Sequence, residues 1–163
     1  MSVFKSIKKY LDKSLEFITA FTMGFLVLDV TWQVITRYVL KDPSSWTEEV
    51  ATYLVMWVGL LGAAVALNRG AHLGIDYFVA KLTVKKRLIT EAFVYFIIFT
   101  FSVLILLIGG IQLVIDTLQL GQTTPATGIK VGYWYLSIPI SGFFISIYSG
   151  EFFVEVLLKM NRE

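Results

Sequence analysis

Four long apolar stretches, separated by short polar segments, make up most of this chain. They cover residues 17–36, 50–68, 92–115 and 131–150, and the first contains a single charge, Asp29. Each approaches or exceeds the roughly 20 residues that an α-helix needs to cross a hydrocarbon core about 30 Å thick. The pattern predicts an all-α integral membrane protein whose single transmembrane domain covers residues 1–163. The expected helices are 14–38, 46–67, 84–118 and 133–158.

The composition agrees with a membrane protein and excludes several other classes. Hydrophobic residues make up 56% of the chain and charged residues 16%, which is more apolar than a soluble domain requires. The first apolar stretch is too long for the core of a signal peptide and no cleavage pattern follows it, so we expect a retained helix. The absence of Cys excludes disulfides and thiolate metal sites. A single His argues against haem held by two imidazoles.

The Lys and Arg residues indicate the topology. All of the 14 except Arg37, Lys41 and Lys130 fall on one side of the membrane if the N-terminus is cytoplasmic. Positive charge accumulates in the cytoplasmic segments of membrane proteins. The sequence therefore predicts that both termini are cytoplasmic. The basic residues serve as topology signals, so we expect no nucleic-acid partner.

Three polar residues follow helical spacing in the first span. Asp29, Gln33 and Arg37 are four residues apart, so they share one face of a helix. An ionisable group inside the membrane is costly and normally faces protein or a water-filled cavity. The face could couple transport to protons or ions, or it could pack against a neighbouring helix. We prefer packing, because no second buried acid supplies a relay.

The start of the second span carries a capping signal. In the segment Ser45-Trp46-Thr47-Glu48, the Ser45 hydroxyl can accept from the amide of Glu48 while the Glu48 carboxylate reaches back. That arrangement predicts a helix N-terminus here and leaves the neighbouring Glu49 available for a partner.

Small residues mark faces where helices approach closely. Gly59 and Ala63 form a small-xxx-small pair in the second span, and Gly142, Ser146 and Gly150 repeat every four residues in the fourth. Trp57 lies in the middle of its span rather than in an interfacial belt, which also favours helix packing.

Two connecting segments differ in character. Residues 68–86 alternate apolar and polar positions, which predicts a short helix lying in the headgroup plane on the cytoplasmic side. His72 stands alone there, so we expect it to hydrogen-bond backbone rather than bind metal. The outer loop 119–132 is polar and uncharged up to Lys130.

The residues alone indicate an accessory role. There is no Ser/His/Asp set, no cluster of metal ligands and no phosphate-binding glycine loop, so we expect neither enzyme activity nor a cofactor. Isolated transporters usually contain buried charges and broken helices, which are scarce here. Several small-residue faces and one polar stripe exceed what a lone bundle needs. We therefore expect a scaffold subunit of a larger membrane complex.

The order of the motifs resembles the small membrane subunit, of the DctQ type, of tripartite ATP-independent periplasmic (TRAP) transporters. The similarity covers essentially the whole chain. Its motifs are Arg37-Tyr38, Trp46-Thr47-Glu48-Glu49, Trp57, Gly59-Leu60-Leu61-Gly62-Ala63-Ala64, Arg69-Gly70-Ala71-His72-Leu73-Gly74-Ile75-Asp76, Thr124-Pro125-Ala126-Thr127-Gly128-Ile129, and Trp134-Tyr135-Leu136 with Pro139.

This resemblance implies a role in sodium-driven uptake across the bacterial inner membrane. In such systems a periplasmic binding protein captures an organic acid, and a large elevator-type membrane subunit transports it. The small subunit enlarges the fixed scaffold and binds neither substrate nor sodium. Substrates of the family include C4-dicarboxylates, sialic acids and other carboxylated sugars. The partners implied are a large subunit on a separate chain, the binding protein and membrane lipids.

Three groups of candidate site residues follow. The proposed large-subunit interface comprises Asp29, Gln33, Arg37, Trp46, Glu49, Trp57, Gly59 and Ala63. The cytoplasmic loop motif comprises Arg69, His72 and Asp76. The proposed contacts with the binding protein are Thr123, Thr124 and Thr127, within the loop 123–128.

Two other classes remain open at this point. A small proton-coupled multidrug exporter also has four helices and a membrane-embedded acid, for which Asp29 is a loose analogue. A membrane anchor of a respiratory complex would carry haem or quinone, against which the single His argues.

Overall fold

The computed structural model describes residues 2–70 and 83–161, and it is almost entirely helical there. Within that part of the chain, four helices are long and apolar enough to cross a membrane: Lys8–Leu40, Ser45–Asn68, Val84–Gln119 and Val131–Met160. The all-α, four-helix membrane architecture is thus confirmed. The short interfacial helix expected within residues 68–86 lies largely outside the described residues.

The first hairpin pairs α1 (Ser2–Ile35) with α2 (Ser45–Asn68). A π-helical turn, η1 (Thr36–Leu40), ends the first arm, and Lys41 adopts a left-handed conformation with φ 56°. The Asp42 amide then donates to the Thr36 carbonyl over 3.1 Å, which closes the helix end. The helix begins at Ser2 rather than near residue 14, because no Gly or Pro interrupts the basic segment before the apolar stretch.

A seven-residue repeat governs the packing of α1 on α2. The buried residues of the first arm are Leu15, Thr22 and Asp29 in α1 and Thr36 in η1. Those of α2 are Thr47, Val50, Leu54, Leu61, Ala64 and Leu67. Spacings of three, four and seven residues place buried side chains on one seam, as in a left-handed coiled coil. The rest of α1 presents large apolar side chains outward, as a lipid- or protein-facing helix does.

The second hairpin consists of one long rod and one broken helix. The rod runs through α4 (Val84–Phe101), the π-helical η2 (Ser102–Gly109) and α5 (Gly110–Gln119). The returning arm consists of α6 (Val131–Tyr135) and α7 (Ser137–Met160).

The break between α6 and α7 has an identifiable cause. Pro139 has no N–H, so the carbonyl four residues before it, in Tyr135, loses its helical partner. The helix is therefore interrupted on the N-terminal side of this proline, at Leu136.

Close glycine contacts hold α7 against the rod. A Cβ added at Gly142 would lie 2.7 Å from Leu106 Cβ and 2.8 Å from the Leu107 amide nitrogen. At Gly150 it would lie 3.3 Å from the Phe99 ring. The small-residue face of this helix thus lets its backbone approach η2 directly.

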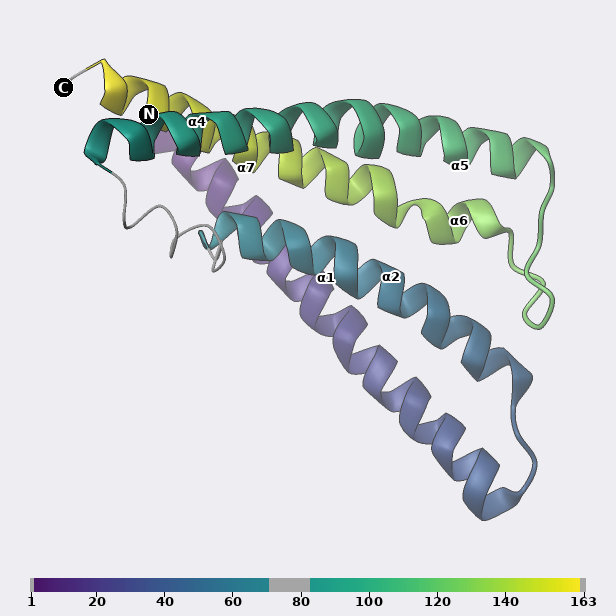
Figure 1. Ribbon diagram of the computed structural model, residues 1–163. Helices are drawn as coiled ribbons and strands as arrows, with labels where there is room; N and C mark the ends of the chain where they lie inside the picture. The colour runs from purple at the N-terminus through teal and green to yellow at the C-terminus, as the bar shows by residue number, and fades with distance from the viewer. Residues whose placement is uncertain (1, 71–82, 162–163) are drawn as a thin grey trace.

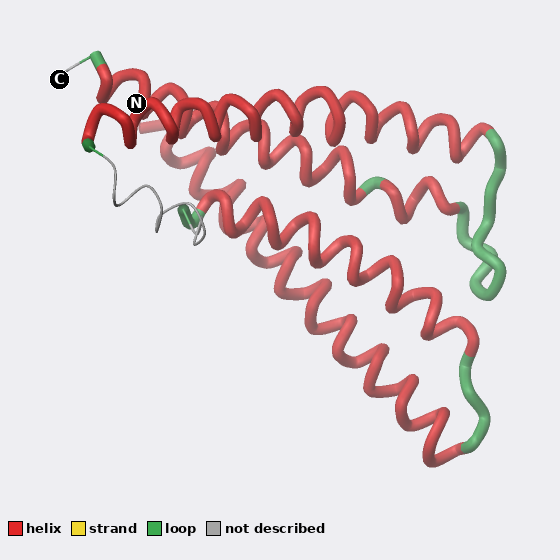
Figure 2. The backbone as a smooth tube through the Cα atoms, in the orientation of Figure 1, coloured by secondary structure: helices red, strands yellow, loops and turns green. Residues whose placement is uncertain are grey.

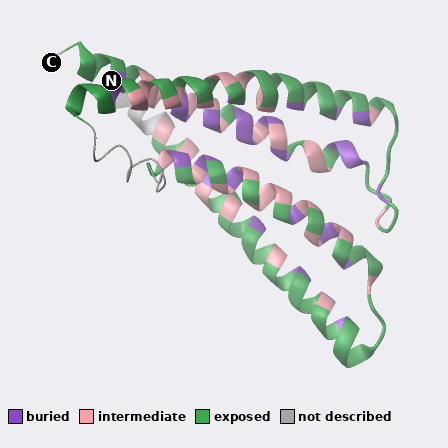
Figure 3. Ribbon diagram, in the orientation of Figure 1, coloured by how far each residue is buried: buried purple, intermediate pink, exposed green. Residues whose placement is uncertain are grey.

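The two hairpins meet along α2 and α7 and diverge toward one end of the molecule (Figure 1, Figure 2). Their shared core comprises Leu15, Leu61, Ala64, Leu67, Ile145 and Tyr148. We call the end that holds both chain termini the terminal end, and the opposite end, with residues 41–44 and 120–130, the loop end. Burial follows this shape: the diverging arm of α1 is mostly exposed (Figure 3). At the loop end, the hairpin of α1 and α2 therefore stands apart from the second hairpin. We call this part of the first hairpin the splayed arm.

Candidate functional site

A carboxylate from α2 fixes the 120–130 loop at the loop end. One oxygen of Glu49 accepts from the Ala126 amide at 2.7 Å. The other accepts from the Thr127 amide at 3.2 Å and the Thr127 hydroxyl at 2.6 Å. The Thr124 hydroxyl shares a 2.7 Å hydrogen bond with that of Thr127. We call Glu49, Thr124, Ala126 and Thr127 the loop clamp. Sequence reasoning placed Glu49 and the threonines in separate hypotheses, and the structure joins them.

The loop sequence is suited to this shape. Gly121 and Gly128 adopt positive φ angles of 65° and 68°, which residues with side chains rarely adopt. Thr123 and Lys130 form an isolated antiparallel bridge across the loop. The loop is therefore a fixed hairpin-like feature, and its exposed residues are presented in one conformation.

A hollow of about 530 Å³ lies beside the loop clamp on the outer surface. It is lined by Ser45, Glu48, Glu49, Thr52, Tyr53, Pro125 and Ala126. The acidic rim and the fixed loop form the most distinctive polar feature of the loop end.

The capping box predicted for Ser45 and Glu48 is wrong. The residue preceding α2 is Ser44, and no side chain forms a capping hydrogen bond there. The Ser44 hydroxyl instead pairs with that of Thr47 at 2.7 Å, because the helix starts one residue earlier than a cap at Ser45 requires. Glu48 points toward Arg37, with 3.8 Å between Nη2 and Oε2.

We expect Glu49→Ala to release the 120–130 loop. The substitution removes the acceptor of the Ala126 and Thr127 amides, so amide exchange at these two residues should accelerate roughly tenfold or more. Hydrogen-exchange mass spectrometry of the loop peptide measures this. Glu48→Ala is the matched control, because its ion pair is exposed and worth about 0–1 kcal/mol. Equal exchange in the two variants would show that the clamp does not order the loop.

Asp29 is buried inside the membrane span. Its side chain is 5% exposed, and neither carboxylate oxygen has a hydrogen-bond partner among the described residues. The threonines one heptad away, Thr22 and Thr36, satisfy their hydroxyls on backbone carbonyls of their own helix. A carboxylate at such depth is costly. The described part of this chain supplies no hydrogen-bond donor that would offset this cost for Asp29.

The polar stripe of α1 does not act as one unit. Asp29 lies on the buried seam, Gln33 is half-buried and Arg37 is exposed, reaching across to Glu48 on α2. The stripe therefore twists from the α1–α2 seam to the outer surface over two turns.

Two tryptophans tie α2 to α6. The Trp57 indole donates to the Trp134 carbonyl at 2.9 Å, and Tyr53 stacks on the Trp134 ring with centroids 4.9 Å apart. Trp57 thus packs inside the chain, as its mid-span position suggested. The Trp134 indole nitrogen is buried with no hydrogen-bond partner among the described residues.

The small-residue face of α2 remains open. Gly59 and Ala63 are exposed, and no described atom outside the local helix lies within 4 Å of a Cβ built at Gly59. Trp46, at the start of the same helix, is also exposed. These residues contribute little to the fold of this chain.

Polar contacts fasten α1 at the terminal end. Arg69 binds Glu16 with nitrogen–oxygen distances of 3.1 and 2.9 Å. The Tyr148 hydroxyl donates to Asp12 at 2.7 Å, and Lys8 pairs with Glu151. The other members of the predicted loop motif, His72 and Asp76, lie outside the described residues.

Sequence reasoning missed the acids of the α1 extension, Asp12 and Glu16. The signal that could have found them is the uninterrupted helical sequence from Ser2 into the first apolar stretch.

Comparison with known proteins identifies the family. The family model described as "Tripartite ATP-independent periplasmic transporters, DctQ component" matches residues 26–159. The sialic acid TRAP transporter small permease protein SiaQ of Vibrio cholerae is 42% identical over 84 residues, covering 52% of this chain and 49% of that protein. The match thus spans about half the length of that relative.

A longer alignment and a match within a larger permease give the same result. A putative TRAP transporter small permease protein of Haemophilus influenzae is 27% identical over 142 residues, 87% of this chain and 86% of that protein. The sialic acid TRAP transporter permease protein SiaT of Haemophilus influenzae is 34% identical over 93 residues, which are 56% of this chain but 15% of that protein. Such subunits are transporter components rather than enzymes. Since the family model matches most of its length, the chain belongs to the DctQ family, the small permease subunits of TRAP transporters.

Proposed function

We propose that this protein is the stationary scaffold subunit of a sodium-driven TRAP uptake system in a bacterial inner membrane. A separate large permease chain carries out elevator-type transport. This subunit enlarges the fixed part of the complex, against which the transporting domain of the large chain moves. A wide helical anchor resists tilting in the bilayer while another domain slides past it. The observation that carries the proposal is the exposed small-residue face at Gly59 and Ala63, together with a buried Asp29 that has no hydrogen-bond partner among the described residues, in a member of the DctQ family.

The large subunit is expected to cover the splayed arm formed by α1 and α2. Association inside membranes depends on close packing at small residues and on interhelical hydrogen bonds, because lipid is as apolar as the helices. The exposed Gly59 and Ala63 provide the first. Asp29 provides an acceptor for the second once α1 shifts on α2, because both of its carboxylate oxygens are buried in the seam between these helices. SiaT, in which a segment similar to this chain is 15% of a larger permease, supports such an association.

Charge reversal at Arg37 tests this interface. The Arg37 side chain is about half-exposed at the tip of the arm. We expect Arg37→Glu to lower the amount of large subunit that co-purifies with the tagged protein by about tenfold, as the loss of one charged contact in a desolvated interface requires. Lys41→Glu, four residues further on the exposed turn, should retain the partner. Equal recovery with both variants would place the interface elsewhere.

The loop end is proposed to face the periplasm and to contact the substrate-binding protein. With both termini cytoplasmic, the positive-inside rule is satisfied and the loop clamp faces the compartment of that protein. Thr123 is exposed and Thr127 is half-buried, on a loop next to an acidic hollow, which gives a defined docking surface. Thr124 is buried and serves to hold the loop rather than to meet a partner. Under this proposal, Glu49→Ala should also slow binding-protein-dependent uptake, whereas Glu48→Ala should not. If Glu49→Ala releases the loop but leaves uptake unchanged, the loop is not part of the docking surface.

The transported compound is proposed to be a small organic acid. The named relatives belong to transporters of sialic acid, C4-dicarboxylates and isethionate, which are all organic anions. No described feature of this chain distinguishes among them, since the buried polar residues comprise one acid and a set of hydroxyl groups. The large permease and the substrate-binding protein would then select among organic anions.

A further inference from the structure

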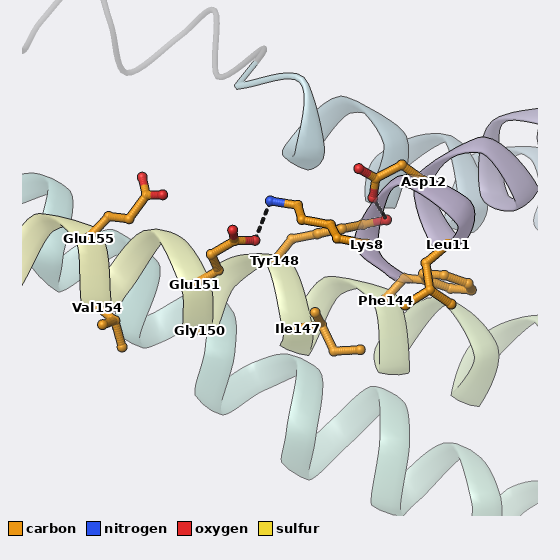
Figure 4. Close-up of a pocket in the computed structure, with 10 residues that line it drawn as sticks. All are labelled: Lys8, Leu11, Asp12, Phe144, Ile147, Tyr148, Gly150, Glu151, Val154 and Glu155. Carbon is orange, nitrogen blue, oxygen red and sulfur yellow. Dashed lines mark hydrogen bonds and ion pairs between the residues drawn. The ribbon is translucent and has the colours of Figure 1, made fainter. Parts of the chain in front are cut away.

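A groove between α1 and α7 opens at the terminal end of the molecule. It has a volume of about 480 Å³, within the range of about 300–1,000 Å³ typical of small-molecule sites. It is lined by Lys8, Leu11, Asp12, Phe144, Ile147, Tyr148, Gly150, Glu151, Val154 and Glu155 (Figure 4). Its walls are largely apolar, while its charged side chains gather toward one part of the opening.

The groove crosses the boundary between hydrocarbon and headgroups. Glu151 follows Val131 by about 20 residues, which at 1.5 Å per residue is roughly 30 Å, the thickness of the hydrocarbon core. On α1, Lys8 and Asp12 precede the apolar stretch that begins at Phe17. The charged rim therefore lies in the headgroup layer, and Phe144 lies on the hydrocarbon side.

One stripe of α7 carries this change in polarity. Phe144, Ile147, Glu151 and Glu155 recur at intervals of three or four residues and line the same groove. The stripe is apolar toward the membrane centre and acidic toward its surface. A ligand that complements it must itself be amphipathic, with an apolar chain and a polar head that can face acids.

The rim contains both signs of charge with an acidic excess. Lys8 pairs with Glu151, and Asp12 accepts from the Tyr148 hydroxyl. Glu155, by contrast, has no ion pair or hydrogen bond with any residue that the structure describes. One cation and three carboxylates leave an excess of negative charge, with one carboxylate free at the opening.

We propose that this groove binds one phospholipid whose headgroup carries a primary amine. Its ammonium group would donate hydrogen bonds to Glu151 and Glu155, and its phosphate would lie toward Lys8. One acyl chain would lie along the apolar wall. A choline headgroup has no N–H to donate, and an anionic headgroup without an amine meets the acidic excess. The lipid would thus brace the α1 extension against α7.

The inference rests on the membrane location of the helices and not on the proposed transport role. In a bilayer, the apolar walls alone give no preference, because any lipid chain can solvate them. Selectivity must come from the headgroup contacts. A helix of a partner subunit is the competing occupant, and it would show no preference among lipids.

Lipid titration of the purified full chain tests the proposal. The delipidated protein is mixed with phosphatidylethanolamine, phosphatidylcholine or phosphatidylglycerol of identical acyl chains, and bound lipids are counted by native mass spectrometry. We expect one saturable site that prefers phosphatidylethanolamine. Glu155→Gln should weaken that binding about tenfold, as the loss of one charge-assisted hydrogen bond implies. Asp116→Asn, which removes the same charge from the far end of α5, should not change it.

A second variant tests the apolar part of the same site. Val154→Trp adds bulk at an exposed position that lines the groove and should reduce binding of all three lipids. Equal binding of the three headgroups by the unaltered protein would overturn the proposal. So would phosphatidylethanolamine binding that keeps its full affinity in both Glu155→Gln and Val154→Trp, because the lipid would then bind elsewhere.

Discussion

Replacing Gly142 by valine is expected to prevent the second hairpin from closing. The new Cβ would lie 2.7–2.9 Å from atoms of Leu106 and Leu107, two of which belong to the backbone of η2. Backbone cannot move aside as a flexible side chain can, so α7 must shift away from the rod. Overpacking typically costs about 1–3 kcal/mol, and contact with backbone places Gly142→Val at or beyond the upper limit. We expect much less folded protein on size-exclusion chromatography. The melting temperature of the remaining protein should also fall strongly.

Gly24→Val provides the matched control for this prediction. Gly24 also lies in a membrane-spanning helix, but no described atom outside its local helix lies within 4 Å of a Cβ built there. The same substitution should therefore leave folding and melting nearly unchanged. If Gly142→Val were tolerated as well as Gly24→Val, the close approach of α7 and η2 would be refuted.

Replacing Asp29 by valine is expected to have opposite effects on the isolated subunit and on the complex. A carboxylate at the centre of a membrane helix costs about 2.5–3.5 kcal/mol, and here no described residue offsets that cost. The isolated variant should therefore melt several degrees higher than the unaltered protein. If the large subunit donates to Asp29, the same variant should lose much of the co-purifying partner.

The control for Asp29→Val is Thr22→Val on the same seam. The Thr22 hydroxyl already donates to the Ile18 carbonyl of its own helix at 2.8 Å, so it needs no external donor. This change should alter neither melting nor partner recovery appreciably. A destabilised Asp29→Val variant would mean that the carboxylate has a favourable role within the chain. Full recovery of the large subunit with Asp29→Val would show that Asp29 is not part of the interface.

The helices could be predicted from the sequence because membrane spans are set by length and polarity alone. The four spans, the packing role of Trp57 and the close-packed face at Gly142 all follow from local patterns. The small-residue pattern could not show which face remains open. Gly59 and Gly142 carry the same signal, yet the first is exposed and the second touches η2 backbone.

The polar sites were harder to predict because their partners are remote in the chain. Glu49 binds Thr127, 78 residues away, and Lys8 binds Glu151, 143 residues away. Neither pairing leaves a local sequence signal. The capping error at Ser45 has a different origin, since a helix start shifted by one residue changes which hydroxyl can cap it.

Isolation of the tagged protein from membranes in mild detergent tests whether it is a subunit of a larger permease complex. Mass spectrometry identifies the proteins that elute with it, and their stoichiometry is measured on the intact complex. We expect one major partner, a large membrane-spanning permease, in a fixed ratio to this chain. Elution of the chain alone, as a monomer or a homo-oligomer without any large permease, would contradict its role as a scaffold subunit.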